Sequence, residues 1–122
     1  QELGEEGWPT WVFSNHDFPR HAERWKSRKV QLQEPKMKLL ATLLLTLRGT
    51  PCLYYGEELG MRQSVLRRSE ILDPVGQRYW PFFKGRDGAR TPMQWTAEGG
   101  FSEGKSWLPY GDLRLNVDQV FM

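Results

Sequence analysis

The sequence is poor in cysteine, and it opens without a recognisable targeting segment. Cys52 is the only cysteine among the 122 residues. An internal disulfide is therefore excluded, and so is a zinc site built on cysteine ligands. A single thiol fits a reducing compartment, and the acidic residues 1–6 contain no secretory signal, so we expect a cytoplasmic location. No residue pattern indicates a metal or another cofactor.

Long hydrophobic runs and clusters of one charge are also missing. The most apolar run, residues 39–47, is far shorter than the roughly 20 residues that a helix needs to cross a bilayer. The 17 Lys and Arg residues nearly balance the 15 Asp and Glu residues and form no basic stripe. We therefore predict neither a membrane nor a nucleic acid as a partner. The chain also lacks an initiator methionine, and we expect it to begin inside a longer protein.

Residues 11–17 change from apolar to polar within a few positions. Trp-Val-Phe has strong strand propensity and runs directly into Ser-Asn-His-Asp. This change is typical of a buried strand that ends at a pocket, and parallel α/β barrels place catalytic residues at such strand ends. Asp17 offers a carboxylate, His16 an imidazole, and Asn15 an amide that both donates and accepts. The same letters also suit a strand followed by an Asx turn.

The clearest helix is predicted over residues 35–48. Pro35 suits its first position, Gly49 suits its C-terminal cap, and Pro51 prevents its continuation. Its apolar residues fall in two rows, so we expect the helix to be covered on more than one side. The rows are Met37, Leu40, Ala41 and Leu44, and Leu39, Leu43 and Leu47.

A β-prone run at residues 52–55 follows this helix. Strand, helix and strand in this order predict a βαβ unit with two parallel strands. Because the carboxyl ends of parallel strands meet at one edge, residues 15–17 should lie beside residues 56–58. Three carboxylates and a histidine at adjacent strand ends indicate a site.

The other segments are less regular. Part of the polar stretch up to about residue 33 is expected to form a helical turn, and a short helix is predicted at about residues 64–72. From residue 73 on, glycine, proline and aromatic residues are frequent, and no periodic element is predicted. Residues 116–119 resemble a loop that meets a new helix.

Four motifs in one order make the sequence recognisable. Residues 13–17 read Phe-Ser-Asn-His-Asp, and residues 45–51 read Leu-Thr-Leu-Arg-Gly-Thr-Pro. Residues 54–61 read Tyr-Tyr-Gly-Glu-Glu-Leu-Gly-Met, and residues 85–95 read Gly-Arg-Asp-Gly-Ala-Arg-Thr-Pro-Met-Gln-Trp. This series resembles the α-amylase family of glycoside hydrolases (family 13), and within it the exo-acting α-glucosidase and oligo-1,6-glucosidase group. The resemblance covers nearly the whole chain.

The resemblance implies an α/β fold in which residues 1–122 form part of a (β/α)8 TIM barrel. Residues 11–14 would be barrel strand seven, residues 35–48 helix seven, and residues 52–55 strand eight, followed by a long loop. About a quarter of the barrel would be present. The remainder would then be needed for folding.

The aspartate of the Asn-His-Asp motif is the third catalytic carboxylate of the family. The resemblance therefore implies that Asp17 fixes the 2- and 3-hydroxyls of the glucose at the cleavage subsite and helps distort its ring toward the transition state. His16 would donate a hydrogen bond to the same sugar, and Asn15 would belong to the same binding site.

Two further pairs of residues belong to the implied sugar pocket. An arginine of the Gly-Arg-Asp motif meets the non-reducing-end sugar in α-glucosidases; that role is assigned to Arg86, with Arg90 as the rival. Glu57 and Glu58 would shape the pocket floor, with a structural or a sugar-binding role.

The chain departs from the family pattern in two respects. Ala89 stands where the family often has cysteine, which is a mild change. More importantly, the family's nucleophilic aspartate on strand four and acid/base glutamate on strand five have no counterpart among these residues. A retaining glycosidase needs that pair about 5–5.5 Å apart.

The sequence thus predicts part of a retaining α-glucosidase that hydrolyses terminal α-linked glucose from malto- or isomalto-oligosaccharides. One alternative is a transglucosylase or isomerase of the same family, of the trehalose synthase or sucrose isomerase type. Another is a non-catalytic relative, like the barrel ectodomain of amino-acid-transporter heavy chains. The Asn-His-Asp and Gly-Arg-Asp-Gly motifs argue against the latter, and the sequences of strands four and five would decide.

Overall fold

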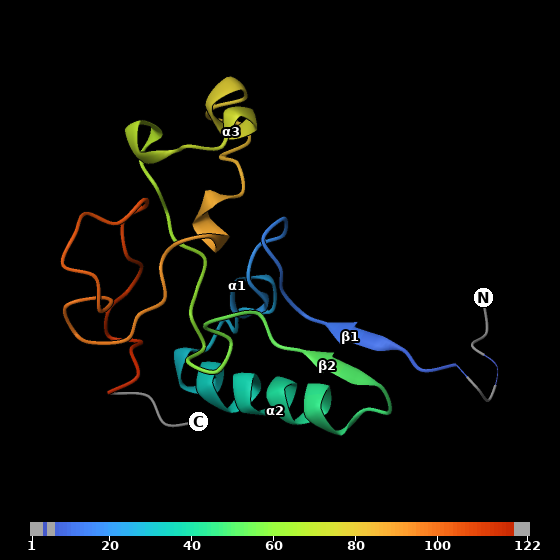
Figure 1. The fold of residues 1–122 in the computed structure, drawn as a ribbon. Coiled ribbons are helices and arrows are strands. Elements are labelled where there is room, and N and C mark those ends of the chain that lie inside the picture. The colour runs from blue at the N-terminus through green and yellow to red at the C-terminus, as the bar shows by residue number, and fades with distance from the viewer. Residues whose placement is uncertain (1–3, 5–6, 119–122) are drawn as a thin grey trace.

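The computed structural model describes Gly4 and residues 7–118. Its helices and strands are β1 (Thr10–Val12), α1 (His21–Arg24), α2 (Gln33–Thr46), β2 (Thr50–Cys52) and α3 (Pro74–Arg78). Three short 3-10 turns lie at Val30–Leu32, Arg68–Glu70 and Asp87–Ala89. Figure 1 shows α2 lying along the pair of strands, while the segments after β2 extend away from this pair as a series of loops and short turns.

The two strands form a parallel pair. Thr10 lies opposite Thr50, and Val12 lies opposite Cys52. Since α2 connects the two strands, the predicted βαβ unit is confirmed. The helical turn expected in the polar stretch is also present, as α1. Both strands therefore deliver their carboxyl ends to the same side, where the polar residues follow.

The bounds of both strands differ from those predicted. β1 ends before Phe13, because the Phe13 carbonyl accepts a hydrogen bond from the Arg24 guanidinium instead of a neighbouring strand. The predicted strand at residues 52–55 shares only Cys52 with β2. The Tyr54 N–H donates to Glu57 Oε2 at 3.2 Å, and Gly56 turns the chain with a φ of 82°. These local bonds replace the ladder that propensity alone predicted.

The predicted bounds of the long helix are also wrong by two residues at each end. The helix begins at Gln33, whose side-chain Oε1 accepts from the Ser27 N–H at 2.7 Å. Pro35 is thus the third helical residue, still within the first turn where a missing N–H costs little. The helix ends at Thr46, because Leu47 is extended with a ψ of 142°.

Gly49 does not cap the helix as predicted. Its φ is 138°, and a Cβ there would lie 2.5 Å from the Pro9 carbonyl oxygen. The Thr50 N–H donates to that same carbonyl at 2.9 Å. Glycine is therefore required where the chain enters β2 and passes close to the start of β1.

The two apolar rows of α2 differ in burial. Met37 and Leu44 of the first row are buried, whereas Leu39 and Leu43 of the second are 67% and 45% exposed. Every residue of β1 and β2 is exposed as well. Within the part of the chain that the structure describes, the second row therefore lacks the cover that the sequence predicted.

After β2, two predictions fail for identifiable reasons. The helix expected at residues 64–72 is reduced to the turn Arg68–Glu70, because the Ser64 N–H donates to the Gly88 carbonyl at 3.0 Å. Conversely, α3 forms where no element was predicted. Asp73 caps it by accepting from the Val75 N–H at 3.1 Å, and Pro74 is its first residue.

A small hydrophobic cluster supports this second half. Leu66, Ile71 and Leu108 are buried together, and Trp80 packs against them. Residues 116–118 form a turn, and Gln119, the last residue of the predicted loop-to-helix segment, lies outside the described residues. In the described ranges, none of the helices has the length and apolar character to cross a membrane.

We predict that the 122-residue chain on its own does not unfold cooperatively. A two-stranded sheet is below the three or more strands needed for independent stability. Burying one large apolar side chain contributes about 1.5–3 kcal/mol, and several of those on α2 stay exposed. Thermal unfolding followed by near-UV circular dichroism should give a broad, shallow change. A sharp transition from material that light scattering shows to be monomeric would contradict this expectation.

Candidate active site

Asp17 lies between two arginines from a distant segment. Its Oδ1 accepts from Arg86 Nη1 at 3.1 Å and from Arg90 Nη2 at 3.2 Å. Its Oδ2 is 3.4 Å from His16 Nε2, and the Asp17 side chain is 46% exposed. The residues of the Asn-His-Asp and Gly-Arg-Asp motifs therefore meet, and they present a carboxylate with open access to solvent. Carboxylate acceptors beside guanidinium donors suit a ligand rich in hydroxyl groups.

Arg86 is itself fixed from behind by Asp73. The Arg86 Nε and Nη2 atoms donate to the two carboxylate oxygens of Asp73 at 2.8 and 3.1 Å. The Arg86 backbone N–H adds a third bond at 2.9 Å, and the Asp73 side chain is fully buried. These hydrogen bonds hold the pKa of Asp73 far below its usual range, and they raise the pKa of Arg86. A bidentate pair of this kind sets the plane of the guanidinium.

The aspartate of the Gly-Arg-Asp motif has a structural position. Asp87 is buried, and its Oδ2 accepts from the backbone N–H groups of Leu72 and Asp73 at 2.6 and 2.7 Å. It thus joins the motif to the segment that carries Asp73. Two consecutive residues therefore bind Asp73, the N-cap of α3. Arg86 binds its carboxylate, and Asp87 binds its backbone N–H.

Arg90 holds the backbone of the Asn-His-Asp loop as well as the Asp17 carboxylate. Its Nε donates to the His16 carbonyl at 2.9 Å. The Arg90 carbonyl accepts from Trp107 Nε1 at 3.0 Å, so Arg90 joins the Asn-His-Asp loop to the segment that carries Trp107. The two arginines therefore contact the Asn-His-Asp loop differently. Arg86 binds the Asp17 carboxylate, whereas Arg90 binds both this carboxylate and the His16 backbone carbonyl.

Asn15 forms the Asx turn that the sequence left open as an alternative. Its Oδ1 accepts from the N–H groups of Asp17 and Phe18 at 2.9 and 3.1 Å. The Asn15 amide oxygen is therefore used within the loop. This turn bends the chain so that the Asp17 side chain faces Arg86 and Arg90.

Arg20 ends the same loop and anchors it in the interior. The residue is 1% exposed, and its guanidinium lies 5.0 and 4.7 Å from the ring centroids of Tyr54 and Tyr55. It donates to the Tyr55 carbonyl at 2.5 Å and to the Ala89 carbonyl at 3.1 Å. Arg20 therefore joins three segments: the loop after β1, the turn after β2 and the turn beside Arg90.

The second histidine forms a buried polar cluster with Ser14 and Glu57. His21 Nδ1 lies 3.0 Å from Ser14 Oγ and 3.1 Å from Glu57 Oε1. Burial raises the pKa of Glu57, but hydrogen bonds from His21 and Ser14 outweigh this effect, and the net pKa is lowered. Glu57 is thus directed into the protein, whereas Glu58 is exposed.

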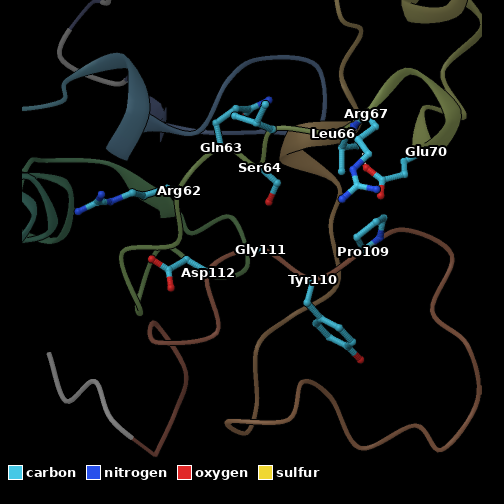
Figure 2. A pocket seen from close by; sticks show the side chains of 11 residues that line it. Arg62, Gln63, Ser64, Leu66, Arg67, Glu70, Pro109, Tyr110, Gly111 and Asp112 are labelled. Carbon is cyan, nitrogen blue, oxygen red and sulfur yellow. Dashed lines mark hydrogen bonds between the residues drawn. The ribbon is translucent and has the colours of Figure 1, made fainter.

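The carboxylates predicted at the end of β2 therefore lie in different surroundings. Glu58 lines an open hollow of about 430 Å³. The other residues of this hollow are Tyr55, Met93, Trp95 and Trp107. A further polar groove of about 390 Å³ lies between residues 62–70 and 109–112 (Figure 2). Figure 2 shows Arg67 and Glu70 close together on one side of it, with the Tyr110 ring pointing away from them.

The sequence did not single out Asp73 or His21 as part of this arrangement. A signal existed for Asp73, because Asp followed by Pro is typical of an N-cap and first helical residue. No periodicity indicates His21, whose partner Ser14 is seven residues earlier. Among the described residues, no cluster of three or more His, Cys, Asp or Glu side chains could hold a metal ion.

Comparison with known proteins gives one consistent family. A family model described as the α-amylase catalytic domain matches residues 1–119. A probable α-glucosidase of Rhizobium meliloti is 51% identical and matches 85% of this chain and 19% of its own length. An oligo-1,6-glucosidase of Bacillus cereus is 34% identical and matches 97% of this chain and 25% of its own length.

Solved structures give the same picture. The α-glucosyl transfer enzyme XgtA is 43% identical with a TM-score of 0.83, over 93% of this chain and 22% of that one. The trehalulose synthase MutB from Pseudomonas mesoacidophila is 34% identical with a TM-score of 0.79, over 96% of this chain and 25% of that one. The chain thus spans about a fifth to a quarter of the length of these relatives.

We predict that the Asp73–Arg86 pair makes the stability of the full-length protein depend on pH. The pKa of Asp73 is lowered in the folded state, so the pair stabilises the fold above the unfolded pKa of about 3.9 and loses this effect as the pH falls below it. Asp73→Asn keeps a good N-cap residue but removes the charge.

The free energy of unfolding should therefore differ between the native protein and Asp73→Asn at pH 7, and the difference should shrink in acid. Asp73→Ala, which also removes the cap, should cost about 1 kcal/mol more. Urea unfolding at several pH values measures both effects. A difference that stays constant down to pH 2 would mean that the charge of Asp73 is not what stabilises the fold.

Proposed function

The chain belongs to the α-amylase catalytic-domain family, and we propose that it forms part of a retaining α-glucosidase that removes terminal α-linked glucose from oligosaccharides. The observation that carries the proposal is the meeting of Asp17 with Arg86 and Arg90 at the carboxyl end of β1. In a (β/α)8 barrel that end of the strands carries the active site.

The proposed role of Asp17 is to grip two hydroxyls of the glucose that is cleaved. Its exposed carboxylate can accept from both, and this grip would strengthen as the ring distorts toward an oxocarbenium-like transition state. His16, 3.4 Å from the carboxylate, would donate to the same sugar. Asn15 would contribute through the turn that sets the orientation of Asp17.

Arg86 is the proposed contact for the sugar at the non-reducing end. Its guanidinium plane is fixed by Asp73, and its Nη1 donates to Asp17 Oδ1. Arg90 remains the rival, since both guanidinium groups already make hydrogen bonds within the protein. Between the two glutamates, exposure favours a sugar contact for Glu58, and burial favours a supporting role for Glu57.

The rest of the catalytic apparatus would come from other parts of the full-length protein. We propose that β1, α2 and β2 are strand seven, helix seven and strand eight of the barrel. The remaining strands would then cover the exposed row of α2 and supply the nucleophile and the acid/base. A cytoplasmic location stays a prediction from the single cysteine.

A second candidate is glucosyl transfer to a sugar acceptor instead of water. The solved structures reported above favour it, because their names describe an α-glucosyl transfer enzyme and a trehalulose synthase. Both reactions use the same grip on the donor glucose, so Asp17 would serve either one. They differ in what enters after the leaving group departs.

We predict that the full-length protein releases glucose from an aryl α-glucoside. The 122-residue chain alone should not, because it has no match to the nucleophile or acid/base motifs. Product analysis with maltose, isomaltose and sucrose distinguishes the two candidates. Free glucose as the main product supports hydrolysis, and rearranged or longer sugars support transfer. Turnover by the repurified chain alone would refute the prediction.

We further predict that Asp17→Asn in the full-length enzyme lowers kcat by about 10²–10⁴-fold, because two charge-assisted hydrogen bonds contribute about 1.5–3 kcal/mol each in the transition state. The thermal midpoint should change little, since the Asp17 side chain is half-exposed. Steady-state kinetics measures the loss. A variant that keeps more than about a tenth of kcat would remove Asp17 from the catalytic groups.

A further inference from the structure

Loop 14–21, which carries Asp17, is closed at its base by a hydrogen-bonded cluster. Ser14 Oγ accepts from the His21 backbone N–H at 2.9 Å, which joins the first and last residues of the loop. His21 Nδ1 lies 3.1 Å from Glu57 Oε1, and Glu57 Oε2 accepts from the Tyr54 N–H at 3.2 Å. The base of the loop is therefore bound to the turn that follows β2.

The hydrogen positions in this cluster follow from donor and acceptor chemistry. Glu57 is a carboxylate with a lowered pKa, so it can only accept. His21 Nδ1 must then carry the proton that bonds Glu57 Oε1. Ser14 Oγ accepts from the His21 backbone N–H and lies 3.0 Å from His21 Nδ1. The buried carboxylate thus receives one hydrogen bond on each oxygen, from His21 Nδ1 and from the Tyr54 N–H.

The cluster is enclosed by rings and shielded from solvent. The side chains of His21 and Glu57 are 7% and 4% exposed. The His21 ring centroid lies 6.2 Å from those of Phe13 and Trp25, and these two rings contact each other edge to face at 5.2 Å. A buried carboxylate in such surroundings is costly unless all its bonds are made. Losing one donor should therefore rearrange the cluster and, with it, the loop.

We propose that His21 and Glu57 are positioning residues that act on the reaction through Asp17. They hold the two ends of loop 14–21 against the turn that follows β2, and the loop in turn brings Asp17 Oδ1 to Arg86 and Arg90. Both side chains are buried. The proposal rests on the proposed function for its kinetic consequence, but its structural claim concerns only the position of Asp17.

The kinetic test compares single and double variants of the full-length enzyme on an aryl α-glucoside. Glu57→Gln replaces one carboxylate oxygen with an NH2 group, so the side chain can no longer accept with both ends from His21 and Tyr54. It should lower kcat up to about a hundredfold, the effect expected when a catalytic group shifts by about 1 Å. KM should change less than about threefold. Glu23→Gln, which removes only the surface pair with Lys26, is the matched control and should leave both constants unchanged.

A double-mutant cycle separates positioning from general destabilisation. If Glu57 acts through Asp17, Glu57→Gln should reduce kcat no more than about twofold further once Asp17→Asn is present. His21→Asn, whose amide can replace the Nδ1 donor, should keep most of the activity, whereas His21→Leu should lose it. Equal losses from Glu57→Gln in both backgrounds, or equal losses from the two His21 variants, would overturn the proposal.

A crystal structure of full-length Glu57→Gln supplies a readout that needs no activity. We expect Asp17 Oδ1 to move away from its contacts at 3.1 and 3.2 Å with Arg86 and Arg90. An unmoved Asp17 would overturn the proposal even if kcat had fallen. If the native enzyme turns over no α-glucoside, the proposed function fails, and this structural comparison still decides whether Glu57 positions Asp17. If Glu57→Gln does not fold, His21→Leu takes its place in both experiments.

Discussion

The site depends on one buried cation, the guanidinium of Arg20. It stacks on Tyr54 and Tyr55 and donates to carbonyl groups of Tyr55 and Ala89, so it joins segments that are 35 and 69 residues away. Burial lowers its pKa, but an arginine stays protonated because its ordinary pKa is above 12. Carbonyl oxygens and aromatic faces compensate part of the charge, and the carboxylates of Glu57 and Glu58 also favour the charged form. The end of the Asn-His-Asp loop is therefore fixed against both the turn after β2 and the turn beside Arg90.

Much of the fold could be predicted from local sequence signals, and the errors of that prediction also have local causes. The βαβ unit follows from hydrophobic spacing and turn residues, which need no knowledge of distant contacts. The strand ends were misplaced because side chains of Arg24 and Glu57 bind the backbone at Phe13 and Tyr54. Propensity carries no information about such bonds, since it describes a residue's average surroundings.

The site was less accessible to reasoning from residues alone. The parallel strands predicted that polar residues would gather at one edge, but Arg86 follows Asp17 by 69 residues and comes from the irregular segment after α3. Only the family motif indicated that contact, and the roles of the individual residues stay proposals. The role of Asp73 as an N-cap could be predicted from the Asp-Pro sequence. Its pairing with Arg86 could not, because it depends on the close approach of two loops. No regular spacing in the sequence indicates the Ser14–His21–Glu57 cluster, whose members come from separate segments of the chain.

The ion pairs around Asp17 also determine the sign of the local electric field. Three carboxylates, those of Asp17, Asp73 and Asp87, surround two guanidinium groups, those of Arg86 and Arg90. The group therefore keeps one excess negative charge, located nearest to solvent on Asp17, because Asp73 and Asp87 are buried. A ligand whose ring becomes positive would be attracted to this edge, while the arginines keep the carboxylate oriented before any ligand arrives.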